Sequence, residues 1–308
     1  MPDEVRLGFI GCGGNARGHM RRLMQLPDAR IVAVCDVVRE AAERAAADTG
    51  ATPYTAFEEM LAREELDAVY LSLPVFAHGE PEFAVIERGL PFFVEKPVAR
   101  DLETALAIAA RVREKRLLTA VGYQLRYAGT VDAARERLAG QRIGLVAGRY
   151  WCGSGMGDPG RWLRQMALSG GQIVEQATHT IDLMRYLAGE IVEVFSYHTS
   201  QVLRSIDCPD HTATAMRFEN GAVGALTTSW AYPHDWQQTN VIDILFENAR
   251  LEWSTRGLVV VDEAGEQRIE RPGPGIDEVF VAAVRTGDPA PIRSPYDDAV
   301  RTLAVTLA

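Results

Sequence analysis

The 308-residue sequence has no hydrophobic run that approaches the length of a membrane span, about 20 apolar residues. It also has no excess of positive charge, and its formal net charge of −10 disfavours a nucleic-acid partner, because binding to a phosphate backbone relies on basic patches. The four cysteines are scattered without a Cys-x-x-Cys pair, which favours a reducing, cytoplasmic compartment. The acidic start, Met1–Glu4, does not have the pattern of a signal peptide. We therefore expect neither a membrane nor a nucleic acid as a partner.

What the sequence does have is an ordinary globular composition, with 47% hydrophobic and 24% charged residues, and a length that favours two domains. Up to Gly122, short apolar runs alternate with helical segments, which predicts parallel βαβ units. Beyond Gly122, consecutive strands with short turns predict a mostly antiparallel sheet, and Asn220-Gly221 is a strong hairpin signal. We expect an α/β protein: a Rossmann-type doubly wound parallel sheet in residues 1–122, then an α+β domain with a large, mostly antiparallel open sheet in residues 123–308. The last helix, 295–307, is expected to pack back on the first domain.

The second predicted sheet carries apolar side chains on both faces. Its own helices cover one face, and Val223, Leu226 and Trp230 are examples assigned to the other. A broad exposed apolar sheet is a liability unless something covers it. We therefore expect a homodimer or a homotetramer that associates through this sheet.

The first domain is organised around the motif Gly11-x-Gly13-x-x-Ala16, which follows a predicted strand and precedes a predicted helix. Gly11 permits a tight turn, Gly13 lets the backbone approach a pyrophosphate, and Ala16 lets the helix pack close to the strand. Asp36 ends the next apolar run, about 20 residues further on, where a carboxylate can accept hydrogen bonds from the ribose hydroxyls of NAD. The simpler alternative is a strand–turn–helix without a nucleotide. Arg39 could pair with a phosphate, which leaves NADP open.

Glu95-Lys96-Pro97 follows another predicted parallel strand, and ligands of open α/β sheets bind beyond the carboxyl ends of such strands. A lysine there can donate a hydrogen bond to a substrate oxygen. The alternative, given equal weight, is a surface Lys96 paired with its neighbour Glu95.

A predicted long helix, 173–187, places Glu175, His179 and Asp182 at i, i+4 and i+7, so that they share one face. Histidine is the side chain best suited to take or give a proton near neutral pH. Two other interpretations stay open: a partly buried histidine satisfied by a carboxylate, and a metal site. The metal site is disfavoured because no second histidine lies at ligand spacing, and we expect no metal.

Four segments of the chain resemble motifs of the glucose–fructose oxidoreductase, inositol dehydrogenase and rhizopine-catabolism (Gfo/Idh/MocA) family. Their order and spacing match that family over almost the whole chain. They are Gly8–Gly13, Leu73-Pro74 followed by His78, Glu95-Lys96-Pro97 and Gly170–Gly189.

The resemblance implies roles for individual residues. Lys96 corresponds to an active-site lysine that touches the substrate hydroxyl and the nicotinamide ribose, and His179 to a proton-transferring histidine assisted by Glu175. Glu95 would hold the nicotinamide end of the cofactor, and Pro97 is often cis at this place. Glu175 stands where many relatives have Asp, which keeps the charge but lengthens the reach and leaves the substrate class open.

The cofactor implied is NAD, with NADP as the alternative. Its expected contacts are Gly11, Gly13, Gly14, Asn15, Asp36, Ser72, Leu73, Pro74, His78, Glu95, Lys96 and Gln124. Weaker candidates for substrate contact are Arg126, Trp162, His179, Tyr232 and His234. Arg126 could instead belong to the domain hinge, and core or interface packing is an equal alternative for Trp162 and Tyr232.

The implied function is an NAD(P)-dependent dehydrogenase that transfers hydride between the cofactor and a secondary alcohol or ketone of a sugar, a cyclitol or a derivative. One alternative is a glycoside-processing enzyme that oxidises, eliminates and then re-reduces its substrate with recycled NAD. Another is a regulator that senses NAD(P) without turnover.

Overall fold

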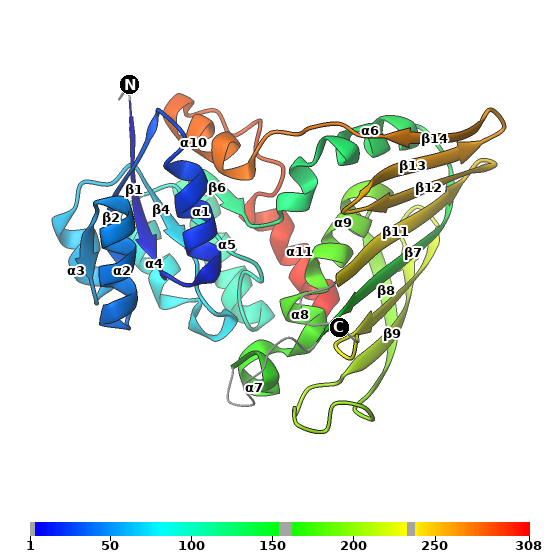
Figure 1. Cartoon of the computed structure of the whole chain (residues 1–308), viewed down its shortest axis with the longest axis horizontal. Helices are drawn as coiled ribbons and strands as arrows, with labels where there is room; N and C mark the ends of the chain where they lie inside the picture. Colours follow the sequence, from blue (N-terminus) through cyan, green and yellow to red (C-terminus); the bar gives the residue numbers. More distant parts are fainter. Residues whose placement is uncertain (1–3, 154–161, 233–237) are drawn as a thin grey trace. The chain divides into compact units, whose positions relative to one another are not determined.

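The computed structural model describes residues 4–153, 162–232 and 238–308, and these form two compact units (Figure 1). The first unit holds the described residues up to Tyr123 together with Gly275–Val300. The second unit holds the described residues of Gln124–Pro274 together with Arg301–Ala308. The chain therefore leaves the first unit after Tyr123 and returns to it near its end. Across the described ranges, no helix is both long and apolar enough to cross a membrane.

The described strands of the first unit form one parallel sheet in the order β3-β2-β1-β4-β5-β6. The strands are β1 Val5–Ile10, β2 Ala29–Cys35, β3 Thr52–Tyr54, β4 Ala68–Leu71, β5 Phe92–Val94 and β6 Thr119–Val121. The helices of this unit are α1 Gly14–Leu23, α2 Arg39–Thr49, α3 Phe57–Arg63, α4 Glu80–Glu87, α5 Leu102–Lys115 and α10 Ile276–Thr286, with a 3-10 turn η1 at Val75–Ala77. The strand order reverses between β1 and β4, which is where ligands bind in doubly wound sheets.

Stacked aromatic rings from neighbouring strands form the centre of this unit. The ring centroids of Phe9 and Tyr70 lie 4.8 Å apart, and those of Tyr70 and Phe93 lie 4.7 Å apart. Phe280 of α10 packs edge-on against Tyr70 and Phe93. All four side chains are buried, so α10 completes the core of the first sheet although it follows the second sheet in the sequence.

The second unit is built on a larger sheet in the order β14-β13-β12-β11-β7-β10-β9-β8. Its strands are β7 Ile143–Cys152, β8 Ile191–Thr199, β9 His211–Phe218, β10 Val223–Ser229, β11 Gln238–Phe246, β12 Ala249–Ser254, β13 Gly257–Asp262 and β14 Gly265–Ile269. Neighbours pair antiparallel except β10 and β7, which run parallel. The predicted hairpin at Asn220-Gly221 joins β9 to β10, and the predicted fold class is confirmed.

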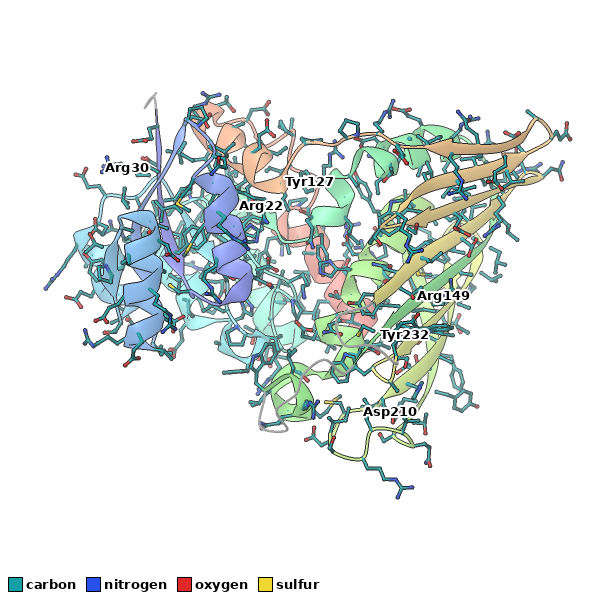
Figure 2. The ribbon with its side chains drawn as sticks, in the orientation of Figure 1. Arg22, Arg30, Tyr127, Arg149, Asp210 and Tyr232 are labelled. Carbon is teal, nitrogen blue, oxygen red and sulfur yellow. The ribbon has the colours of Figure 1, made fainter. Side chains whose placement is uncertain are left out.

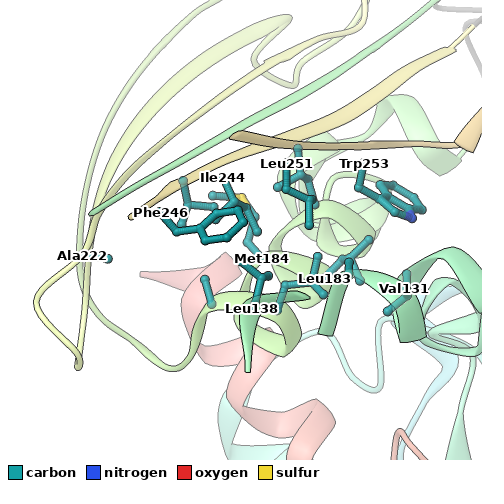
Figure 3. Close-up of a cluster of buried hydrophobic side chains, with 14 of the residues drawn as sticks. Val131, Leu138, Leu183, Met184, Ala222, Ile244, Phe246, Leu251 and Trp253 are labelled. Atoms are coloured by element: carbon teal, nitrogen blue, oxygen red, sulfur yellow. The ribbon is translucent and has the colours of Figure 1, made fainter. Parts of the chain in front are cut away.

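Helices cover the inner face of this sheet. Those that contact its strands are α6 Gly129–Leu138, α8 Gly171–Glu175 and α9 Thr178–Ala188. The unit also holds α7 Met166–Ser169 and the 3-10 turns η2 Gln124–Tyr127 and η3 Trp162–Arg164, while α11 Tyr296–Leu307 starts in the first unit and ends in the second. In Figure 3, Val131 of α6 and Met184 of α9 pack with Leu251 and Trp253 of β12. A side chain at Gly148 of β7 would lie 2.8 Å from the sulfur of Met184, so the glycine lets α9 approach the sheet closely.

The residues on the outer face of the sheet are not all those that the sequence predicted. Val223 is exposed as expected, but Leu226 and Trp230 are fully buried, and assigning them to the outer face was wrong. Successive side chains of a strand point to opposite faces, so Leu226, three positions from Val223, must point inward. The outward partners of Val223 on β10 are Ala225 and Thr227.

Candidate active site

The turn after β1 leaves an open cradle beside the N-terminus of α1. Gly11 has a φ of 94°, and a Cβ there would lie 2.2 Å from the carbonyl oxygen of Ser72, so a side chain is excluded. By contrast, a Cβ at Gly13 or Gly14 would meet nothing within 4 Å. Gly13 is the N-cap of α1 and offers no side-chain hydrogen bond, and Asn15 is exposed in the first turn. Free N–H groups and empty space at a helix start fit the pyrophosphate of a dinucleotide.

The carboxylate of Asp36 is held by the backbone on two sides. Its Oδ2 accepts a hydrogen bond from the Cys12 N–H at 2.8 Å, and its Oδ1 accepts one from the Val38 N–H at 2.9 Å. Each carboxylate oxygen keeps a second lone pair, so the group can still accept from two ribose hydroxyls. Val37 and Val38 are exposed beside it. The chemistry of this donor and acceptor set fits an NAD dinucleotide.

The loop after β4 lies against the turn after β1, because the Ser72 N–H donates to the Ile10 carbonyl at 2.8 Å. Ser72, Leu73 and Pro74 are half-buried and lead into η1. His78 turns inward, with Nδ1 2.6 Å from Glu82 Oε1 and both side chains fully buried. Among the described residues, His78 Nε2 has no hydrogen-bond partner. The contacts of these residues with a cofactor stay predictions.

Glu95 and Lys96 continue from the end of β5. The Glu95 N–H donates to the Leu71 carbonyl at 2.8 Å, which extends the sheet by one residue, and the Glu95 side chain is almost completely buried. Its Oε2 accepts a hydrogen bond from the Lys96 N–H at 3.2 Å. Lys96 is half-buried, and the Lys96–Pro97 peptide bond is cis, as the family resemblance leads one to expect.

The sequence reasoning missed two residues behind Glu95: His19, which contacts it, and Asp277, which holds His19. His19 of α1 has its Nε2 2.9 Å from Glu95 Oε1 and its Nδ1 2.5 Å from Asp277 Oδ1 on α10. Burial by itself lowers the pKa of His19, but the hydrogen bonds to Asp277 and Glu95 outweigh it and raise the pKa to about 9. His19 follows Ala16 by three positions and so lies on the same face of α1. This spacing was the sequence signal that could have placed His19 on the buried face of the helix. No sequence pattern linked it to Asp277.

The predicted long helix is interrupted, which corrects the reasoning from its spacing. Residues 171–175 form α8, and a new helix, α9, begins at Thr178. The Ala177 N–H reaches back five residues to the Gln172 carbonyl, and the His179 N–H only three, to Gln176. Glu175 and His179 are both half-buried, but they stand on different helices, so the i, i+4 spacing does not align them.

Buried Gln172 and half-buried Gln176 fix the break between these helices. Gln172 Nε2 donates to the Ser229 carbonyl at 2.7 Å. Gln176 Oε1 accepts from the Trp230 indole at 2.6 Å and from the Cys152 thiol at 3.1 Å. Because β7 and the end of β10 supply these partners, the sheet positions the segment that carries Glu175 and His179.

Arg126 and Asp182 form a buried pair. Arg126 Nε donates to Asp182 Oδ2 at 2.8 Å, and Nη2 donates to Oδ1 at 2.6 Å. Thr302 donates to the same Oδ1, and the Arg126 guanidinium lies over the ring of Tyr186. Burial raises the pKa of Asp182, although Arg126 and Thr302 act in the opposite direction. The contacts of Asp182 are therefore with Arg126 and Thr302, and a substrate contact of Arg126 stays a prediction.

The other candidates are spread over the second unit. Gln124 is exposed at the start of η2, and Trp162 is half-buried at the start of η3. Tyr232, labelled in Figure 2, donates its backbone N–H to the Cys152 carbonyl. With Trp151 it lines a cavity of about 580 Å³ on the sheet. His234 lies outside the described residues. In the described ranges, no group of three or more His, Cys, Asp or Glu side chains could hold a metal ion.

Each unit thus carries part of the predicted set. The first unit brings together Gly11, Gly13, Asp36 and the loops that begin at Ser72 and Glu95. Lys96 belongs to this unit, and Glu175 and His179 belong to the second. The meeting of Lys96 and His179 over one substrate stays a prediction.

Models of one protein family match both parts of the sequence. A model described as "oxidoreductase family, NAD-binding Rossmann fold" of the Gfo/Idh/MocA group matches residues 5–123. A model of the Gfo/Idh/MocA C-terminal domain matches residues 131–252.

Individual proteins of known name are also similar to this chain. The scyllo-inositol 2-dehydrogenase (NAD⁺) of Bacillus subtilis is 27% identical over 240 residues, which cover 76% of this chain and 70% of that one. The rhizopine catabolism protein MocA of Rhizobium meliloti is 26% identical over 313 residues, covering 99% and 94%. A levoglucosan dehydrogenase solved with NADH superposes with a TM-score of 0.87 at 21% identity, covering 98% and 95%, and shows the shared fold.

Proposed function

Because this chain belongs to the Gfo/Idh/MocA oxidoreductase family, we propose that it uses NAD to oxidise a secondary alcohol of a sugar, a cyclitol or a derivative. The observation that carries the proposal is the open cradle at Gly13 together with the backbone-held carboxylate of Asp36. That carboxylate can bind both ribose hydroxyls and would repel a 2′-phosphate, so NAD is favoured over NADP. Similarity to an inositol dehydrogenase supports a polyol substrate.

The residues of the chain bind the reactants, orient them and move a proton, while NAD, when bound, supplies the hydride acceptor. Lys96 donates a hydrogen bond to the reacting oxygen and stabilises the charge that develops there. His179 takes the hydroxyl proton, and Glu175 assists it. Arg126, Trp162 and Tyr232 are proposed substrate contacts. The proposed cofactor contacts are Gly11, Gly13, Gly14, Asn15, Asp36, Ser72, Leu73, Pro74, His78, Glu95, Lys96 and Gln124.

The test measures NADH formation by stopped-flow absorbance with a panel of polyols that includes scyllo-inositol, myo-inositol and levoglucosan. We expect at least one of them to reduce NAD. Lys96→Ala should leave NAD affinity near normal and lower turnover by about 10²–10³-fold, the usual cost of removing one donor to a developing oxyanion. Lys115→Ala, a change of the same kind at the end of α5, is the matched control. Turnover that survives in Lys96→Ala would make this lysine structural.

Two other outcomes would replace the proposal. Substrate consumed without net NADH would favour an oxidation–elimination reaction in which the cofactor is recycled. Binding of NAD without an absorbance change for any polyol would favour a regulator that senses the cofactor.

The outer face of the second sheet is the proposed contact between copies of the chain. Phe195 and Tyr197 project from β8 and are more than half exposed. In register beside them, small residues continue across the face, with Phe195 opposite Ala215 and Ala215 opposite Ala225. Large rings at one edge and a shallow row of alanines next to them suit a self-complementary contact related by two-fold symmetry.

Sedimentation velocity tests this contact. Phe195→Asp should convert the dimer or tetramer to a smaller species, because it introduces a charge into a face that the proposed contact between copies would bury. Glu219→Gln, at the exposed turn after β9, is the control. A wild-type protein that sediments as a monomer at micromolar concentration would contradict the proposal.

A further inference from the structure

Three buried charged side chains, continued by one exposed arginine, form a hydrogen-bonded chain inside the first unit. His19 of α1 stands between the carboxylates of Glu95 and Asp277, and Arg22 Nε donates to the second oxygen of Asp277 at 2.6 Å. His19, Glu95 and Asp277 are each less than 10% exposed. Figure 2 shows Arg22 on α1. The chain thus links the helix that starts at the dinucleotide cradle to the residue that precedes Lys96.

Geometry decides how many protons the His19 ring carries. A neutral imidazole has one N–H, yet both ring nitrogens lie within hydrogen-bond distance of a carboxylate oxygen. Arg22 Nη2 also lies 2.9 Å from Nδ1, but Asp277 Oδ1 is closer, at 2.5 Å. If Nδ1 carried no proton, its lone pair and those of Oδ1 would repel each other at that distance. A ring with protons on both nitrogens satisfies both carboxylates.

Glu95 passes this constraint to the backbone of Lys96. While Oε1 is held by His19, Oε2 accepts from the Lys96 N–H and packs against Gly122, where a Cβ would lie 2.8 Å away. We propose that His19, by bridging Glu95 and Asp277, is a positioning residue that fixes the Glu95 carboxylate and, through it, the backbone of Lys96 for catalysis. The proposal deepens the proposed function and rests on the role assigned there to Lys96.

Groups from every surrounding element face the His19 ring. They are Glu95 after β5, Asp277 of α10, Arg22 of its own helix and the phenol of Tyr70 on β4, whose ring centroid lies 5.6 Å away. Loss of one ring proton removes one of the two carboxylate hydrogen bonds. When the proton on Nε2 is the one lost, Glu95 Oε1 loses its donor and only Oε2 stays held, by the Lys96 N–H, so turnover should fall as the pH rises through the pKa of His19, about 9.

Two substitutions separate the halves of the bridge. The amide nitrogen of glutamine can occupy the place of the histidine Nε2, so His19→Gln keeps a donor for Glu95 and loses the one for Asp277. The amide nitrogen of asparagine can occupy the place of Nδ1, so His19→Asn keeps the donor for Asp277 and loses the one for Glu95. If Glu95 must be held, kcat should fall by about 10- to 100-fold in His19→Asn and by much less in His19→Gln. The dissociation constant of NAD should change little in His19→Gln and should rise in His19→Asn, because Glu95 is also a proposed contact of the nicotinamide end.

Phe93→Leu is the matched control, because it disturbs the packing against the His19 ring without changing charge. It should lower the melting temperature and leave the shape of the pH profile unchanged. Asp277→Asn is a second variant in case the His19 variants fold poorly. It keeps the Glu95 contact but removes a carboxylate from the ring, so the alkaline fall in turnover should move to lower pH.

Nitrogen-15 chemical shifts of the His19 ring, recorded without substrate or cofactor, test the bridge independently of turnover. Both nitrogens should give imidazolium shifts at pH 8. A neutral ring at pH 8, or equal kcat losses in His19→Gln and His19→Asn, would overturn the inference. If instead the ring titrates as expected and no polyol is oxidised by any variant or by wild type, the proposed function fails and the bridge stands as a structural feature only.

Discussion

Raising the pH from 6.5 to about 9 should remove about 3 kcal/mol from the free energy of unfolding of the first unit. His19 has a pKa of about 9 in the folded protein and a usual value of 6.5, so the folded state holds an extra proton between these values. At about 1.36 kcal/mol for each pH unit, that interval corresponds to about 3 kcal/mol. Because the folded pKa is the higher one, the stabilisation is complete below pH 6.5 and is lost as the pH rises through 9.

Asp277, Cys12 and Cys35 contribute little to the change in the free energy of unfolding between pH 6.5 and 9. Hydrogen bonds from His19 and Arg22 outweigh the burial of Asp277 and hold its pKa below the usual 3.8, so it stays ionised throughout. Burial raises the pKa of Cys12 and Cys35 from 9.0 to about 12, and their effect on stability begins only near pH 9.

Urea unfolding at several pH values, followed by circular dichroism, measures the effect. Tryptophan fluorescence is unsuitable, because all five tryptophans lie between residues 151 and 253, outside the segments of the first unit. The His19→Gln variant should show a nearly flat free energy from pH 6.5 to 9. His198→Gln, an exposed histidine of β8, should keep the wild-type slope. Equal slopes in wild type and His19→Gln would refute the reasoning.

Three further substitutions test other features. Asp36→Ala should weaken NAD far more than NADP in fluorescence titrations, because it removes the acceptor for the ribose hydroxyls, and equal losses would count against that contact. Gly11→Ala should lower NAD affinity at least about tenfold through the clash with the Ser72 carbonyl, whereas Gly18→Ala inside α1, whose nearest contact is the end of Arg22 at 3.5 Å, should not. Arg126→Met should cost about 3–5 kcal/mol in urea unfolding by removing the two guanidinium hydrogen bonds of the buried Asp182 carboxylate, and Asp182→Asn in the same chain should restore part of it.

Local patterns predicted the first sheet well. Short apolar runs that end in glycine or an acid mark β1 and β2, and the motif at Gly11 and Gly13 marks the start of α1. These signals depend only on neighbouring residues, as does the hairpin at Asn220-Gly221. The family resemblance is confirmed, because the two matching models together span most of the chain.

Features that depend on distant residues could not be predicted in the same way. The break before α9 depends on Gln176, which bonds to Trp230 and Cys152, each more than 20 positions away. The bridge at His19 depends on Asp277, 258 positions along the chain. The sequence does not mark β14, because Gly265–Arg268 is polar and exposed on an edge, where no apolar alternation indicates a strand.

The return of Gly275–Val300 to the first unit has a consequence for synthesis on the ribosome. Until those residues leave the ribosome, the aromatic stack of Phe9, Tyr70 and Phe93 lacks Phe280, and His19 lacks one of its two carboxylates. The intervening segment, residues 124–274, takes about 8 to 30 s to translate at about 5–20 residues per second. A nascent chain therefore displays an incomplete nucleotide domain for that interval, and chaperones that bind exposed aromatic surface have their best opportunity then.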